Sequence, residues 1–151
     1  MLHDTRPRVL CVDDDEDSRA MLTALLRLEL MEAKAVGTGA QALSSIRAEQ
    51  FDLYLLESRL PDVDGFELCR RLRAIDPHTP ILFFSGAALE ADVKKGIEAG
   101  ANAYLVKPDL DGLVGSIKQF ASEAETPTAR IIPFAPKTTP SSAFTFDPAA
   151  A

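Results

Sequence analysis

Short, mostly apolar stretches alternate along the chain with longer stretches in which apolar residues recur every three or four positions. The short stretches predict buried β-strands. They cover residues 8–13, 32–36, 51–56, 81–84 and 103–106, the second being the weakest. The periodic segments that follow predict five helices. Strict alternation of strand and helix is typical of an α/β domain with parallel strands, right-handed crossovers and helices on both faces of the sheet.

Apolar residues at helical spacing mark the five predicted helices. They are Leu22, Leu25 and Leu28; Ala42, Leu43 and Ile46; Phe66, Leu68, Cys69 and Leu72; Leu89, Val93 and Ile97; and Leu113, Ile117 and Phe120. The acidic run at residues 13–17 suits the positive end of the first helix. Gly100 follows the fourth helix and is suited to cap its carboxyl end.

Polar residues follow four of the predicted strands at the point where each strand ends. They are Asp13 and Asp14, Glu57, Ser85, and Lys107. In a parallel sheet the carboxyl ends of the strands share one edge, where functional groups gather. We therefore expect these five side chains to meet in one pocket.

The chemistry of this set indicates a phosphoryl-binding site. Asp13, Asp14 and Glu57 would repel one another unless they shared a cation, and an oxygen-only ligand set suits Mg²⁺. Lys107 can pair with an anion as a point charge, and Ser85 can donate a hydrogen bond to it. The alternative is an acidic surface loop with ordinary polar residues at strand ends. One residue would favour that alternative, whereas five at matching ends favour the site.

Composition narrows the classes of partner. The net charge of −7 makes nucleic acids and anionic membranes poor direct partners. The first residues lack a secretory signal pattern, and no apolar run is long enough to span a membrane, so we expect a soluble, cytoplasmic protein. Cys11 and Cys69 lack metal-site or redox-pair spacing and are expected to be small, reduced core residues.

Three regions are expected: a leader at residues 1–7, one domain at 8–124 and a flexible tail at 125–151. The tail holds five of the ten prolines, with Thr, Ser and Ala filling much of the rest. Its apolar residues lie at 130–134, Phe144 and Phe146. They are either incidental in an inert tail or form a motif that docks on a partner or on the chain's own domain.

Four segments resemble the signature segments of response-regulator receiver domains from two-component signalling. They are VLCVDDDEDSRAML, LPDVDGFELCRRLR, PILFFSG and GANAYLVKP. The resemblance runs from about Arg8 to Glu123. It implies a flavodoxin-like, doubly wound five-stranded parallel sheet with strand order 2-1-3-4-5.

The resemblance also implies a role for each pocket residue. Asp13 and Asp14 match the acidic pair that holds Mg²⁺, with the backbone carbonyl of Arg59 as a further ligand. Glu57 occupies the phospho-acceptor position, which also contributes to the metal site. Arg59 itself adds a cation at the rim, which could pair with Asp62 or Asp64 or partly neutralise the site in place of a metal.

The remaining matches concern a conformational switch. Ser85 matches the switch hydroxyl, and Tyr104 matches the aromatic residue that moves inward when the hydroxyl moves. Lys107 matches the phosphate-binding lysine, and its peptide bond to Pro108 is expected to be cis.

The sequence departs from the family at the acceptor, which is normally Asp. Glu57 is one methylene longer, so its carboxylate reaches roughly 1.5 Å further toward Lys107 and Ser85. Displacements near 1 Å can cost about 10²-fold in rate, so phosphotransfer to Glu57 is expected to be negligible. Glu57 would then act with Lys107, Ser85 and Tyr104 to favour an active-like state. The alternative is that these residues persist for stability alone.

The function that we expect is a stand-alone, non-enzymatic interaction module. Its partner would be a histidine kinase, a phosphotransfer protein or a downstream effector. It would bind the face of the fourth helix, fifth strand and fifth helix, with contributions from Leu89, Val93, Lys94, Lys95, Tyr104 and Lys118. One alternative is a receiver still competent for phosphotransfer. Another is a Mg²⁺-dependent phosphohydrolase of the haloacid-dehalogenase type, using Asp13 and Asp15 with Ser85 and Lys107.

Overall fold

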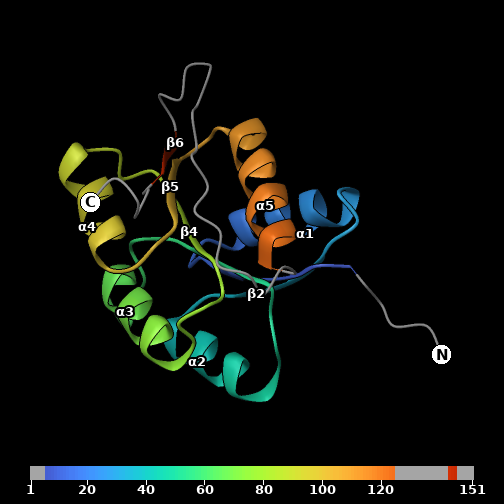
Figure 1. The fold of residues 1–151 in the computed structure, drawn as a ribbon, viewed down its shortest axis with the longest axis horizontal. Coiled ribbons are helices and arrows are strands. Elements are labelled where there is room, and N and C mark those ends of the chain that lie inside the picture. The colour runs from blue at the N-terminus through green and yellow to red at the C-terminus, as the bar shows by residue number, and fades with distance from the viewer. Residues whose placement is uncertain (1–5, 125–142, 146–151) are drawn as a thin grey trace.

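The strands form a single six-stranded sheet in the computed structural model, which describes residues 6–124 and 143–145 (Figure 1). The order is β2-β1-β3-β4-β5-β6. The first five strands are parallel, and β6 is antiparallel to β5. The strands are β1 Arg8–Val12, β2 Glu32–Val36, β3 Leu53–Leu56, β4 Ile81–Ser85, β5 Ala103–Val106 and β6 Ala143–Thr145.

Five helices connect or follow the parallel strands, as the periodicity predicts. They are α1 Glu16–Leu28, α2 Gly39–Ala48, α3 Gly65–Ile75, α4 Glu90–Glu98 and α5 Leu110–Ala124. The expected order 2-1-3-4-5 is thereby confirmed, and β6 is an additional strand that the sequence analysis did not predict. The predicted flexible tail lies outside the described residues except for β6, as does most of the predicted leader.

Side chains alternate between the two faces of the sheet and build two separate cores. Leu10 of β1 and Phe83 of β4 belong to the core under α2, α3 and α4, with Leu68 and Leu72 of α3. The opposite core holds the alternate strand residues with side chains from α1 and α5, among them Cys11, Leu22, Leu26, Leu105, Leu113 and Ile117. Figure 1 shows α1 and α5 together on one side and α2, α3 and α4 on the other. Both faces of the central strands are therefore buried, which explains their continuous apolar runs.

The register of the parallel strands brings their carboxyl ends to one level. Val12 of β1 lies beside Leu56 of β3, and Leu56 lies beside Phe83 of β4. Ser85 of β4 lies beside Val106 of β5. The residues that follow these strand ends are consequently neighbours at one edge of the sheet.

Several local expectations from the sequence are also confirmed by the structure. Gly100, directly after the C-cap of α4, has a φ of 114°, a left-handed conformation that favours glycine. The bond between Lys107 and Pro108 is cis, as the resemblance implies. Cys11 and Cys69 are free and fully buried, as expected. In the part of the chain that the structure describes, no helix has the length and hydropathy needed to cross a bilayer.

Candidate functional site

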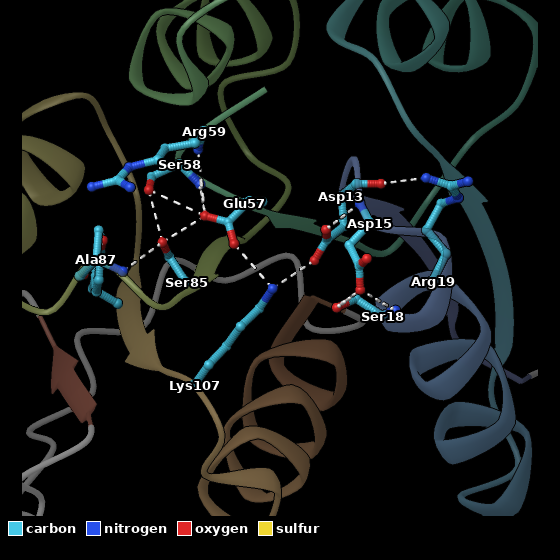
Figure 2. A network of polar contacts seen from close by, with 11 residues as sticks. Asp13, Asp15, Ser18, Arg19, Glu57, Ser58, Arg59, Ser85, Ala87 and Lys107 are labelled. Atoms are coloured by element: carbon cyan, nitrogen blue, oxygen red, sulfur yellow. Dashed lines mark hydrogen bonds and ion pairs between the residues drawn. The ribbon is translucent and has the colours of Figure 1, made fainter. Parts of the chain in front are cut away.

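Four strand ends meet in one cluster of charged and hydroxyl groups (Figure 2). Asp13 follows β1, Glu57 follows β3, Ser85 ends β4 and Lys107 follows β5. The Lys107 Nζ lies 2.8 Å from Oδ2 of Asp13 and 3.0 Å from Oε1 of Glu57. The structure therefore brings together Asp13, Glu57, Ser85 and Lys107 as the strand-end pattern predicts.

The second oxygen of Glu57 is surrounded by hydrogen-bond donors. Its Oε2 accepts from Oγ of Ser85 at 2.5 Å and from the backbone N–H of Ser58 at 2.6 Å. The Ser58 hydroxyl at 3.2 Å and the Arg59 backbone N–H at 3.4 Å complete the set. Donors fixed by a strand end and the loop behind it form an arrangement suited to bind anionic oxygen.

Ser58 is a site residue that the sequence analysis missed. Its hydroxyl lies 2.7 Å from the hydroxyl of Ser85. Because Ser85 donates its own proton to Glu57, the single proton of the Ser58 hydroxyl is shared between Oγ of Ser85 at 2.7 Å and Oε2 of Glu57 at 3.2 Å. Ser85 also accepts the backbone N–H of Ala87 at 3.1 Å. The sequence feature that could have identified Ser58 is its hydroxyl, which directly follows the acid after β3 and adds to the hydroxyl of Ser85.

The hydrogen bonds continue from the pocket to Tyr104. Its side chain is fully buried, its ring is stacked on Phe83 with centroids 5.4 Å apart, and its hydroxyl donates to the carbonyl of Ala87 at 2.6 Å. Ala87 therefore links Ser85 on one side to Tyr104 on the other. Tyr104 occupies the inward position, and Ser85 is turned toward Glu57.

A glycine on α4 makes room for the buried ring. A Cβ added to Gly96 would lie 2.7 Å from a ring carbon of Tyr104 and 3.1 Å from one of Phe83. Real Cβ atoms essentially never approach a ring carbon to 2.7 Å. The inward position of Tyr104 thus depends on the absence of a side chain at residue 96.

The pocket stabilises the charged forms of its acid and its base. Burial raises the pKa of Glu57, but the hydrogen bond from Ser85 and the contact with Lys107 outweigh it, so this pKa lies below its ordinary value. Burial lowers the pKa of Lys107, but the contacts with Asp13 and Glu57 raise it above its ordinary value. At neutral pH the two groups form a partly buried ion pair.

The acidic side of the pocket is arranged differently from the predicted metal site. The side chain of Asp14 is exposed, and Asp15 caps α1 by accepting the N–H of Ser18 at 2.9 Å. Within residues 6–124 and 143–145, no group of three or more His, Cys, Asp or Glu side chains is placed to hold a metal ion. Lys107 occupies the position between the two remaining carboxylates, Asp13 and Glu57. With the long acid of Glu57 and Asp13 both contacting Lys107, the side chains of the parent chain, as placed, do not fit a divalent cation.

The two proposed partners of Arg59 are engaged with helix ends. Asp62 accepts the N–H groups of Gly39 and Ala40 at 2.8 and 2.9 Å, at the start of α2. Asp64 caps α3 by accepting the N–H of Phe66 at 2.8 Å. Figure 2 shows the Arg59 guanidinium directed away from Glu57. Arg59 contributes its backbone N–H to the pocket, while its charge lies at the rim.

Comparison with known proteins agrees with this architecture. The family model of the response regulator receiver domain matches residues 9–118. The DNA-binding response regulator MtrA of Mycolicibacterium paratuberculosis is 42% identical over 103 residues, which are 68% of this chain and 45% of that protein. The transcriptional regulatory protein PrrA of Mycobacterium bovis is 41% identical over 115 residues, 76% of this chain and 49% of that protein. The chain thus spans about half the length of these curated relatives.

A solved structure gives the same answer for the fold. The CheY-like response regulator receiver domain protein from Methanospirillum hungatei aligns with a TM-score of 0.76 and 30% identity, covering 80% of this chain and 98% of that one. The match extends over all five parallel strands and their helices, which is the flavodoxin-like arrangement. The chain therefore belongs to the response regulator receiver domain family, the signal-transduction modules of two-component systems.

Proposed function

We propose that this receiver acts through protein–protein interaction without phosphorylation, because Glu57 stands where the family has a modifiable Asp and favours the active-like arrangement. The observation that carries the proposal is the environment of the Glu57 carboxylate. One oxygen contacts Lys107, and the other accepts the Ser85 hydroxyl and the N–H of Ser58. These are the groups beside which the oxygens of a phosphoryl group on a shorter Asp would lie.

The position of the switch residues supports the same conclusion. Ser85 donates to Glu57 and accepts the N–H of Ala87, whose carbonyl accepts the Tyr104 hydroxyl. Glu57 thus favours the Ser85 orientation that accompanies an inward Tyr104. The mechanism is a shift in population between two packings of the switch, biased by a permanent carboxylate.

The proposed output is the face formed by α4, β5 and α5. Its exposed residues on and before α4 include Leu89, which is 72% exposed, and the two adjacent lysines Lys94 and Lys95. Lys118 of α5 was also expected to contribute to this face; its ammonium pairs with Glu29, the C-cap of α1, at 2.6 Å. The proposed partner is a histidine kinase, a phosphotransfer protein or a downstream effector that recognises this face in its active-like form.

Phosphorylation by a small donor tests the proposal. The chain and its Glu57→Asp variant are incubated with Mg²⁺ and acetyl phosphate, and intact mass is measured. We expect a phosphoryl adduct on the Glu57→Asp variant, because the shorter acid restores in-line geometry, and none on the parent chain. A phosphoryl adduct on the parent that is lost in Glu57→Gln would overturn the proposal and support the phosphorelay alternative.

The phosphohydrolase alternative has less support. It needs the carboxylates of Asp13 and Asp15 to act together, whereas Oδ2 of Asp15 accepts both the N–H and the hydroxyl of Ser18 at the start of α1. Asp13 is held by Lys107. Turnover of p-nitrophenyl phosphate that is abolished by Asp13→Asn would revive this alternative.

A further inference from the structure

The sixth strand is formed by a segment distant in sequence from the receiver domain. Residues Ala143–Thr145 pair antiparallel with β5, with Tyr104 opposite Phe144, Ala103 opposite Thr145 and Leu105 opposite Ala143. In Figure 1, β6 lies beside β5 at the end of the sheet, in the view between α4 and α5. The segment therefore pairs with the central strand of the proposed output face.

The two edge strands of the five-stranded parallel sheet differ in charge. This difference explains why the edge of β5, rather than that of β2, is paired with another strand. The outer strand at one end, β2, carries Glu32 and Lys34, and Lys34 pairs with Glu49. Charged residues on an edge strand discourage pairing with other chains. The other end, β5, has the sequence AYLV and carries no charge. An uncharged edge strand is a template for any extended segment that presents free N–H and C=O groups.

We propose that the edge of β5 is a strand-binding surface and that residues 143–145 are its intramolecular occupant, covering the output face against other strands. A partner or a second copy that adds a strand to β5 must first displace β6. The proposal extends the proposed function by adding regulation at its output face, but the pairing of β6 does not depend on the state of Glu57. Among the described residues, displacement breaks the pairing of three positions with β5, which is a short stretch of backbone pairing, so we expect the cover to be reversible.

The alternation of N–H directions along β5 shows which of its backbone groups face β6. The N–H of Asn102 donates to Ile81 of β4 at 2.7 Å. Successive N–H groups of a strand point to opposite sides, so the N–H of Tyr104 also faces β4, while those of Ala103 and Leu105 face β6. On β6, the N–H groups of Ala143 and Thr145 face β5 by the same rule. The N–H of Phe144 faces away.

This alternation supplies a matched pair of variants in the full chain. Proline removes the N–H of its own residue, so Thr145→Pro deletes a pairing donor, while Phe144→Pro deletes one that faces away from the sheet. Amide hydrogen exchange is measured for Ala103, Leu105 and Tyr104 in the parent and both variants. The Tyr104 amide faces β4 and reports whether the domain remains folded.

We expect Thr145→Pro to accelerate exchange at Ala103 and Leu105 by about tenfold or more, with no change at Tyr104. Phe144→Pro should leave all three rates as in the parent. A synthetic peptide with the sequence of residues 141–148, added at millimolar concentration, should restore protection in Thr145→Pro. Unchanged rates in Thr145→Pro, or equal acceleration in both variants, would overturn the pairing. Acceleration that the peptide does not reverse would overturn the strand-binding surface.

A failure of the strand-binding proposal can be distinguished from a failure of the proposed function. The exchange experiment reports on β5 and β6 alone, whereas the acetyl phosphate experiment reports on Glu57. Either proposal can fail while the other holds.

Discussion

The two halves of the pocket use their polar residues in different ways. On the side of Glu57, a buried carboxylate accepts donors from Ser58 and Ser85, and the hydrogen bonds continue to Tyr104. On the side of the acidic run, Asp15 caps a helix and Asp14 is exposed. Lys107 joins the halves by contacting Asp13 and Glu57.

This difference indicates where the electrostatic balance of the pocket lies. Two buried carboxylates need a cation, and the ammonium of Lys107 provides it from within the chain. The long acid at residue 57 brings its charge within 3.0 Å of that ammonium. The Glu57 half is thus complete without a ligand, whereas the acidic half has no arranged ligand set among the described residues.

The largest effect is expected from removing the cation that joins the halves. Lys107→Met would leave Asp13 and Glu57 buried and unpaired, and we expect a loss of about 2–4 kcal/mol in the free energy of unfolding, measured with urea. Lys118→Met is the matched control. Lys118 pairs with Glu29 at an exposed position, where a salt bridge is worth about 1 kcal/mol or less. Equal losses in the two variants would contradict the central role of Lys107.

A second pair of variants compares the halves directly. Ser85→Ala removes a hydrogen bond to a buried charged group, and we expect a loss of about 1.5–3 kcal/mol in the free energy of unfolding. Asp14→Asn changes an exposed side chain, and its effect should stay within about 0.5 kcal/mol. Urea titrations of both proteins give the comparison. A larger loss in Asp14→Asn would mean that the acidic half, not the Glu57 half, is the organised one.

A third pair tests whether the Glu57 half extends to Tyr104. Gly96→Ala places a methyl group against the rings of Tyr104 and Phe83, and we expect about 1–2 kcal/mol of destabilisation together with displacement of Tyr104. The chain has two tyrosines, so labelled tyrosine gives two resolvable ring signals by NMR. The Tyr104 signal should shift while that of Tyr54 stays.

Gly115→Ala is the control for this test. A Cβ at Gly115 meets nothing within 4 Å, so the substitution should stabilise the exposed face of α5 by about 0.5–1 kcal/mol. An unchanged Tyr104 signal in Gly96→Ala would show that the ring does not depend on the space at residue 96.

The sequence predicted the features that follow from strand topology. Five parallel strands place Asp13, Glu57, Ser85 and Lys107 at one edge whatever the details of the loops, so four of the five strand-end residues could be placed together. Side-chain direction beyond a strand end is set by local hydrogen bonds instead. Asp14 and Asp13 are adjacent, yet one is exposed and the other buried. No hydrophobic pattern distinguishes them.

The missed features depend on contacts between residues far apart in the chain. Ser58 matters because its hydroxyl meets Ser85, a contact that the pattern within β3 does not contain. β6 is similar, since a three-residue segment acquires its strand conformation from pairing with β5. Its neighbours in sequence are rich in Pro, Ser and Thr, and this composition hides the strand.

The smallest expected effect concerns the pH dependence of the Glu57 half. Because the folded-state pKa of Glu57 lies below its ordinary value, its charge stabilises the fold above the ordinary pKa of about 4.3, and this contribution is lost as pH falls through the lowered value. The folded-state pKa of Lys107 is raised, so the stability that its charge contributes is fully present below its ordinary pKa of about 10.4. That stability is lost only at still higher pH. The difference in unfolding free energy between the parent and Glu57→Gln should therefore be constant from about pH 6 to 8 and shrink toward about pH 3.5. Urea unfolding at a series of pH values measures it, and a difference that grows on acidification would mean that Glu57 is protonated, rather than charged, in the folded pocket.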